Sequence, residues 1–238
     1  MADKPKFYEA KIQKIVDLTS TVRHFVLEYD QTADTTFKAG QFLQVHLEKD
    51  GKPHKKPYSI ASSPVLDHQI ELCIKKVEGG YVSNAFHALN VGDHLPMDGP
   101  YGKFLIQEPY QDLIFVATGT GIAPFRSQIR TLFERSAKGQ IWVFFGVRYE
   151  DQILYEREWR DMEAEHKNFH FIPTISRPRP GKWSGETGYV QNAIKKYIPD
   201  AQGKDVYICG IVPMVEDVKK VTQEMGFLES HVHFEKYT

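Results

Sequence analysis

A glycine-rich segment near the middle of the chain has the spacing of a phosphate-binding loop. It runs from Thr118 to Pro124 as Thr-Gly-Thr-Gly-Ile-Ala-Pro, between an apolar run typical of a buried strand and a helical pattern. Gly119 and Gly121 allow a tight turn that brings the backbone close to a diphosphate, and the helix start offers free N–H groups and a positive dipole end. Pro124 replaces the usual third glycine and is favourable at the first helical position. We predict a dinucleotide site here, although an ordinary strand–helix turn has the same composition.

Two segments in the first half could hold a flat ring and its phosphates. Lys56-Pro57-Tyr58-Ser59 opens a predicted strand, where the Tyr could stack on a ring and the Ser could hydrogen-bond to it. The same residues also suit packing in a barrel. Residues 79–83 read Gly-Gly-Tyr-Val-Ser before a predicted helix, with the serine in its first turn. Such a turn forms an anion nest or a plain helix cap, and the sequence leaves both open.

Two further candidates lie late in the chain. Cys209-Gly210 ends an apolar strand pattern just before a helical one, and ligands bind at the carboxyl ends of strands in parallel sheets. A cysteine there could equally be a small core residue. The last residues, 234–238, are polar enough to be a frayed end.

These candidates fall in two halves with different periodicity. Up to about residue 107, short runs are rich in β-branched and aromatic residues, which predicts an antiparallel barrel or sandwich. Beyond it, apolar runs alternate with helical patterns, which predicts a doubly wound parallel sheet. We therefore predict an N-terminal antiparallel β-barrel domain over 1–107 and a C-terminal α/β domain with a doubly wound parallel sheet over 108–238. The expected strands are 8–16, 22–29, 41–48, 57–61, 69–77, 113–118, 141–146, 169–176, 205–209 and 232–234, and the expected helices are 82–89, 124–135, 154–166, 189–197 and 213–225.

Composition narrows the function. The 238 residues carry 30 basic and 31 acidic side chains, a net charge of −1, so no nucleic-acid partner is expected. The 2 cysteines are fewer than the four ligands of an iron–sulfur centre, and no bound metal is expected. The N-terminus lacks the apolar core of a signal peptide, and no apolar run reaches the ~18 residues of a membrane span. We expect a cytoplasmic monomer with no transmembrane segment.

Taken in order, these segments resemble the ferredoxin–NADP(H) reductase superfamily, which joins an FAD-binding antiparallel barrel to a nucleotide-binding α/β domain. The resemblance covers nearly the whole chain. Residues 56–59 match the family's flavin motif, Arg-x-Tyr-Ser or Thr, and residues 80–83 match its Gly-x-x-Ser diphosphate motif. The other matches are the Gly-Pro-x-Gly motif at 99–102, the nucleotide loop at 118–124, the Cys-Gly motif at 209–210, and Glu235-x-Tyr237, which is similar to the carboxyl end of plastid-type members.

Two positions depart from the family pattern. The motif arginine is Lys56 in this chain. Its ammonium is a single point charge, whereas a guanidinium grips a phosphate with two parallel hydrogen bonds, so FAD would be held less tightly. Lys55 beside it is an alternative contact. Thr238 follows the terminal aromatic residue, on which plastid-type members end.

The resemblance implies an FAD-dependent enzyme that exchanges a hydride with NADP(H) and single electrons with ferredoxin or flavodoxin. It assigns hydrogen bonding at flavin N5 to Ser59, packing beside the nicotinamide to Cys209, and proton relay or flavin tuning to Glu235. These three are the predicted catalytic residues. The predicted cofactor-binding residues are Lys56, Pro57, Tyr58, Ser59, Gly80, Val82, Ser83, Thr118, Gly119, Thr120, Gly121, Pro124, Ser176, Arg177, Tyr189, Gln191, Cys209, Gly210 and Tyr237, of which Tyr237 would stack on the flavin.

The nucleotide preference rests on a loop that follows a predicted strand. In NADP(H)-using members a Ser and an Arg hold the 2′-phosphate, matched by Ser176 and Arg177, and a Tyr-x-Gln pair meets the adenosine, matched by Tyr189 and Gln191. An NAD-specific site would place Asp or Glu on the ribose hydroxyls, and neither directly follows this strand. Ser-Arg-Pro is also found in NADH-using oxygenase reductases. We favour NADP(H) over NAD(H).

Two other functions remain open on the sequence alone. One is an NADH-dependent reductase for an oxygenase, or a reductase of free flavin or iron. The other is a flavin- or nucleotide-sensing module without turnover. The motifs do not identify the electron acceptor, because docking depends on the arrangement of charge in space.

Overall fold

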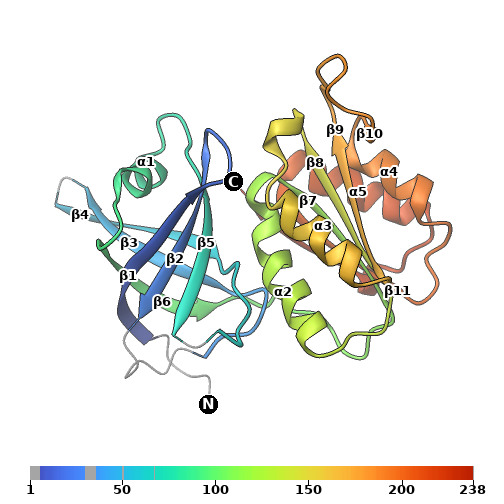
Figure 1. The fold of residues 1–238 in the computed structure, drawn as a ribbon. Coiled ribbons are helices and arrows are strands. Elements are labelled where there is room, and N and C mark those ends of the chain that lie inside the picture. The colour runs from blue at the N-terminus through green and yellow to red at the C-terminus, as the bar shows by residue number, and fades with distance from the viewer. Residues whose placement is uncertain (1–5, 30–35, 50, 67, 238) are drawn as a thin grey trace. The chain divides into compact units, whose positions relative to one another are not determined.

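The chain folds into two units. The computed structural model describes residues 6–29, 36–49, 51–66 and 68–237. One unit, the N-terminal unit, comprises Met1–Ile106 and Ala123–Ser136, and the other, the C-terminal unit, comprises Gln107–Ile122 and Ala137–Thr238. Each unit is built on one six-stranded sheet (Figure 1).

The sheet of the N-terminal unit is antiparallel, with the strand order β4-β3-β6-β1-β2-β5. Ile60, just after β4, bridges Leu72 of β5, and the Ala61 N–H donates to the Glu71 carbonyl at 2.8 Å. These bonds join the two outer strands and close the sheet, which confirms the predicted antiparallel barrel. The elements are β1 Lys6–Asp17, β2 Val22–Tyr29, β3 Phe42–Lys49, β4 Lys52–Ser59, β5 Gln69–Lys75, α1 Tyr81–Ala88 and β6 His94–Tyr101.

The sequence does not predict β6. Pro96 and Pro100 interrupt its pattern, and a proline removes a donor from the strand ladder. Leu95 and Met97 are nevertheless buried at alternate positions. The strand is therefore central in the sheet, between β3 and β1.

The sheet of the C-terminal unit is parallel, with the order β10-β9-β8-β7-β11-β12. Continuous apolar runs such as Leu113–Ala117 form its buried strands, as expected of strands covered on both faces. This confirms the predicted doubly wound sheet. The elements are β7 Asp112–Thr118, β8 Ile141–Val147, α3 Glu156–Glu165, β9 Phe169–Ile175, β10 Glu186–Thr187, α4 Val190–Tyr197, β11 Lys204–Ile211, α5 Val212–Glu224 and β12 Val232–Tyr237, with α2 Ile122–Glu134 following β7 in the chain.

The strand order reverses at β7. The strands β8, β9 and β10 follow on one side of it, and β11 and β12 lie on the other. The crevice outside the carboxyl ends of β7 and β11 is therefore the topological switch point, which is where open α/β sheets bind ligands.

The helices complete the packing of the sheet. Residues of α4 and α5 share a core with β7, β8 and β11, and Trp159 of α3 packs against Phe169 and Phe171 of β9. Across the described ranges, no helix combines the length and the apolar composition that crossing a membrane requires.

The chain end is ordered further than the sequence suggests. β12 continues to Tyr237, which pairs with Ile211 of β11. The frayed end considered for residues 234–238 is therefore wrong as far as Tyr237, and Thr238 lies outside the described residues.

Candidate cofactor and active site

The glycine loop and the Cys-Gly motif form one site, although about ninety residues separate them. Gly119 has a φ of +54° and open space around its α-carbon, whereas a Cβ on Gly121 would lie 2.3 Å from the Cys209 carbonyl oxygen. Gly210 has a φ of +148°, and a Cβ there would lie 2.3 Å from Thr118 Oγ1. The ends of β7 and β11 therefore approach so closely that only glycine fits at either position.

The loop leads directly into a helix start. Thr120 lies in a 3₁₀ helix of one turn over Gly119–Gly121, and α2 begins at Ile122. Pro124 is consequently the third helical residue, not the first as predicted. It still lies in the first turn, where backbone N–H groups have no acceptor within the helix, so the loop keeps the character of an anion site.

The Cys209 thiol is held neutral. Cys209 is fully buried in β11. Burial raises its pKa well above the ordinary thiol value, the charge of Glu235 raises it further, and a hydrogen bond from Tyr237 lowers it. A neutral buried thiol is a poor nucleophile. The side chain can therefore shape an apolar contact at the strand end without forming a covalent bond.

Glu235 and Tyr237 lie beside Cys209 because β11 and β12 are in register. Cys209 is paired with Glu235, and Ile211 with Tyr237. Burial raises the pKa of the Glu235 carboxyl, so this group holds a proton at a higher pH than an exposed glutamate does. Three predicted side chains thus meet at the carboxyl ends of two neighbouring strands.

A cationic site occupies the carboxyl ends of β8 and β9. The Ser176 N–H and hydroxyl both donate to the Val147 carbonyl, at 2.9 and 3.3 Å, and the Arg177 N–H donates to the Arg148 carbonyl at 2.8 Å. Both arginine side chains are exposed. Neither has an ion-pair partner in the part of the chain that the structure describes.

Arg148 is a candidate that the sequence reasoning missed. It directly follows β8, and Arg177 is the second residue after β9, so a search for cations just after each strand of a parallel sheet would have found it. Arg179, two residues on, differs: its guanidinium donates to Glu150 at 3.3 Å and to Asp151 at 2.8 Å. These bonds raise the pKa of Arg179 and leave Arg148 and Arg177 as the available pair.

The predicted adenosine contacts lie at the start of α4. Tyr189 immediately precedes the helix and its side chain is 67% exposed. The Gln191 amide donates to Asp217 at 3.3 Å. A Cβ on Gly146 would lie 3.3 Å from the Val190 Cβ, which places the start of α4 against the end of β8. Tyr189 therefore offers an open ring close to the cationic strand ends.

In the N-terminal unit, Lys56 and Tyr58 share one face of β4, since they pair with Val45 and Leu43 of β3. Tyr58 is half-buried, and its ring meets Phe86 of α1 edge to face at 5.2 Å. Burial raises the pKa of Tyr58 to about 12. The phenol is thus neutral at physiological pH and presents an uncharged ring.

The neighbouring residues show that Lys56, and not Lys55, lies on the same face of β4 as Tyr58. The ring of His54, two residues before Lys56, is 5.6 Å from the ring of Tyr81 in α1, so Lys56 lies between two side chains that contact α1. Lys55 points to the other face, where its Nζ lies 3.3 Å from Asp98. Lys56 is therefore the better placed of the two for a ligand on the Tyr58 face, and the contact with the cofactor itself stays a prediction.

The first turn of α1 offers backbone N–H groups that a ligand could bind. Gly80 caps the helix without a side-chain cap bond. The Ser83 hydroxyl accepts the Val77 N–H at 3.1 Å and donates to the Gly80 carbonyl at 3.2 Å, and the side chain of Val82 is buried in the barrel core. Ser83 therefore holds the shape of the turn, and an anion here would be bound by backbone N–H groups.

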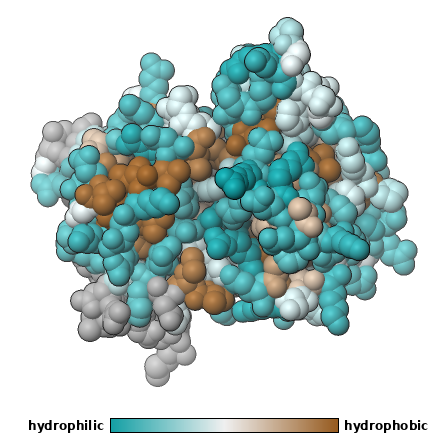
Figure 2. Space-filling model, in the orientation of Figure 1, coloured by the Kyte–Doolittle hydropathy of each residue, from teal (hydrophilic) through white to brown (hydrophobic). Residues whose placement is uncertain are grey.

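Apolar surface borders this turn. Val77 is 52% exposed and Tyr81 is 36% exposed, and Figure 2 shows apolar side chains gathered on the visible face of the N-terminal unit. Ser59, at the end of β4, is almost fully buried. A cation, free backbone donors and exposed apolar side chains together suit a flat ring that carries a diphosphate.

Comparison with known proteins identifies a flavin-binding domain and a nicotinamide-nucleotide-binding domain in this chain. An oxidoreductase FAD-binding domain matches residues 9–106, and an oxidoreductase NAD-binding domain matches residues 115–220. The chain is 34% identical over 239 residues to ferredoxin–NADP reductase B of Sorangium cellulosum, with 97% of each chain covered. It is also 34% identical over 228 residues to a glycine betaine monooxygenase reductase subunit of Pseudomonas aeruginosa, covering 94% of this chain but only 62% of that relative.

A solved structure has the same fold. A ferredoxin NADP⁺ reductase from Neisseria gonorrhoeae, crystallised with FAD and NADP, matches with a TM-score of 0.86 at 22% identity, over 97% of this chain and 98% of that one. Fold and sites thus define an oxidoreductase that binds a flavin and a nicotinamide nucleotide. The near full-length match to the Sorangium enzyme shows that the chain belongs to the ferredoxin–NADP reductase family, with its FAD- and NAD(P)-binding domains.

Proposed function

We propose that this enzyme binds FAD, exchanges electrons with NADP(H) in preference to NAD(H), and passes them singly to a separate ferredoxin or flavodoxin. The observation that supports the nucleotide preference is that Arg148 and Arg177, at the ends of β8 and β9, are both exposed and have no ion-pair partner among the residues that the structure describes. Two guanidinium groups suit a dianionic 2′-phosphate, because each can donate parallel hydrogen bonds to it. NADH has no such phosphate.

On the flavin side, the residues of β4 and α1 would bind and orient the cofactor. Lys56 would meet the diphosphate together with the N–H groups of the first turn of α1, and Tyr58 would lie against the ring system. Ser59 would hydrogen-bond at flavin N5. When bound, FAD accepts two electrons at once and releases them one at a time.

On the nicotinamide side, the residues at the ends of β7, β11 and β12 would position the nucleotide. The glycine loop would hold its diphosphate. The neutral Cys209 thiol would give the nicotinamide an apolar contact with no competing nucleophile. Glu235, whose pKa is raised by burial, would hold or pass a proton, and Tyr237 would stack on the flavin and yield to nicotinamide.

A second candidate is an NADH-dependent reductase of an oxygenase, favoured by the identity to the glycine betaine monooxygenase reductase subunit. The two cysteines of the chain, Cys73 and Cys209, are both buried and are too few for an iron–sulfur centre of the usual four-cysteine type. In either case the single-electron carrier would lie outside residues 1–238.

Steady-state turnover distinguishes the candidates. Purified, FAD-loaded protein is assayed with NADPH and with NADH against ferredoxin, flavodoxin and free flavin. The proposal expects the highest kcat/KM with NADPH and a protein carrier. A higher kcat/KM with NADH would favour the oxygenase reductase, and no turnover with any pair would favour a sensing module.

A further inference from the structure

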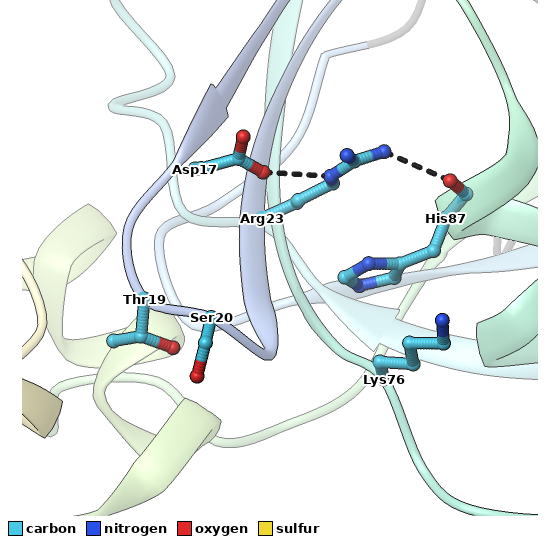
Figure 3. Close-up of a pocket in the computed structure, with 6 residues that line it drawn as sticks. All are labelled: Asp17, Thr19, Ser20, Arg23, Lys76 and His87. Atoms are coloured by element: carbon cyan, nitrogen blue, oxygen red, sulfur yellow. Dashed lines mark hydrogen bonds and ion pairs between the residues drawn. The ribbon is translucent and has the colours of Figure 1, made fainter.

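A cavity of about 380 Å³ lies in the N-terminal unit beside the turn between β1 and β2. Its lining residues come from that turn and the strand ends on either side of it, from the chain after β5 and from the last turn of α1 (Figure 3). None of them belongs to the flavin or nucleotide sites described above. The lining residues are Asp17, Thr19, Ser20, Arg23, Lys76 and His87.

Arg23 is fixed in place and retains unused donors. Its Nε donates to Asp17 at 2.7 Å, and its Nη1 donates to the carbonyl of His87 at 2.8 Å. These bonds orient the guanidinium and neutralise the negative end of the α1 dipole. Its Nη2 has no recorded partner within the described ranges. The guanidinium can therefore donate to a ligand without being reoriented first.

Lys76 adds a second cation. Its ammonium has no ion-pair or hydrogen-bond partner among the described residues, and Figure 3 shows it pointing towards the side of the cavity that holds Arg23 and His87. Against these two positive charges stands the single carboxylate of Asp17. The cavity thus keeps a net positive charge of one with His87 neutral.

Two hydroxyl groups complete the set of donors. Thr19 Oγ1 accepts the N–H groups of Thr21 and Val22, at 3.2 and 3.0 Å, so its own proton is left to be donated. Ser20 is exposed at the tip of the turn. A guanidinium, an ammonium and two hydroxyls around one cavity match the several acceptor oxygens of a phosphate group better than the two of a carboxylate.

We propose that this cavity binds a phosphate group, free or as the monoester of a small molecule, between Arg23 and Lys76. The site is distinct from the flavin diphosphate site, because that site uses the first turn of α1 and this one uses the last. Eight residues of helix separate the two ends by ~10 Å at the usual rise per residue. The neighbouring Asp17 and the net charge of −1 argue against a nucleic-acid backbone as the occupant.

His87 gives the site a spectroscopic reporter. Its Nε2 lies 3.1 Å from the Ile74 carbonyl, so Nε2 carries a proton and Nδ1 is left as the titrating atom. Burial lowers the pKa of His87 and the bond to Ile74 raises it, while Arg23 and Lys76 lower it and Asp17 raises it. A bound dianion beside Arg23 and Lys76 would offset their effect and raise the pKa of His87.

The test is a phosphate titration of the purified full chain, followed by NMR of labelled histidine and assigned with His87→Gln. Sodium chloride at matched ionic strength is the reference. The proposal expects a saturable shift of the His87 signal with inorganic phosphate and a higher His87 pKa at saturation. A His87 response that is the same with phosphate and with chloride would overturn it.

Two lysine variants distinguish phosphate binding in this cavity from a general attraction of phosphate to positive charge. Lys76→Gln should weaken phosphate binding about tenfold, as the loss of one charge-assisted contact would. Lys75→Gln is the control, because Lys75 is also exposed and adjacent but does not line the cavity. Equal weakening in both variants would refute the site. Competition with glycerol phosphate distinguishes the two kinds of ligand. If glycerol phosphate binds more tightly than inorganic phosphate, the ligand is a monoester; if it binds more weakly, the ligand is free phosphate.

Discussion

Replacing Arg177 with Ala should raise the KM for NADPH far more than the KM for NADH. Its guanidinium has no partner within the described chain, and its backbone N–H donates to the Arg148 carbonyl at adjacent strand ends. A charge-assisted hydrogen bond contributes ~1.5–3 kcal/mol, and exposure places this contact at the low end, because water and salt screen it. We therefore expect about a tenfold rise in the KM for NADPH at moderate ionic strength, and less than about twofold for NADH.

The assay is steady-state kinetics with both nucleotides at two salt concentrations. Arg148→Ala should show the same selective effect, smaller at high salt. Arg179→Ala is the matched control, since that guanidinium is bonded to Glu150 and Asp151, and it should leave the ratio of the two KM values unchanged. If Arg177→Ala raised both KM values equally, the 2′-phosphate would not be bound there, and the preference for NADPH would lose its physical basis.

Four more results are expected. Lys56→Arg should lower the FAD dissociation constant, measured by equilibrium dialysis, because a planar guanidinium can donate two parallel hydrogen bonds to a phosphate. An unchanged constant would show that Lys56 does not touch the diphosphate. Tyr237→Ser should strengthen nicotinamide binding and narrow the proposed preference for NADPH over NADH in steady-state kinetics. If neither the flavin spectrum nor the ratio of the two kcat/KM values changed, the ring would not stack on the flavin. Glu235→Gln should raise the melting temperature at neutral pH but not near pH ~4. Because the pKa of Glu235 is raised in the folded state, the protonated carboxyl stabilises the fold fully below its ordinary pKa, and this stability is lost as pH rises through the raised pKa. The neutral amide does not lose it. A gain that was independent of pH would contradict the buried carboxyl. Gly121→Ala should destabilise the fold by ~1–3 kcal/mol in urea unfolding, because its Cβ would lie 2.3 Å from a backbone oxygen. Gly181→Ala is the control: its φ is +70° and its surroundings are open, so it should cost only the backbone strain of about 1 kcal/mol. Equal costs would argue against the close approach at Gly121.

The sequence predicts those features that rest on local periodicity. Continuous apolar runs identify the parallel strands, because strands buried on both faces need no polar alternation. The glycine loop is identifiable because a tight turn and a close approach both require glycine. The sequence pattern does not reveal β6, because Pro96 and Pro100 are typical of a loop. Its pairing with β1 and β3 is what shows that Leu95 and Met97 face a core.

Other features depend on contacts that no local pattern carries. The partial burial of Glu235, and hence its raised pKa, follows from the register of β12 against β11. Lys55 and Lys56 are indistinguishable in the sequence, and the pairing of Lys55 with Asp98 separates them. The hydroxyl of Ser83 is identified as a phosphate contact from the motif, yet its proton is already donated to the Gly80 carbonyl. Which groups remain available to a ligand is thus a property of the fold.

The central claim is that this chain is an FAD-dependent reductase that prefers NADP(H), and anaerobic rapid mixing tests it most directly. FAD-loaded protein is mixed with NADPH or with NADH, and the flavin absorption band is followed. The account predicts that NADPH bleaches the band faster at equal low concentration, and that adding oxidised ferredoxin or flavodoxin restores it. A band that is bleached equally fast by NADH, or that NADPH leaves unchanged, would contradict the account.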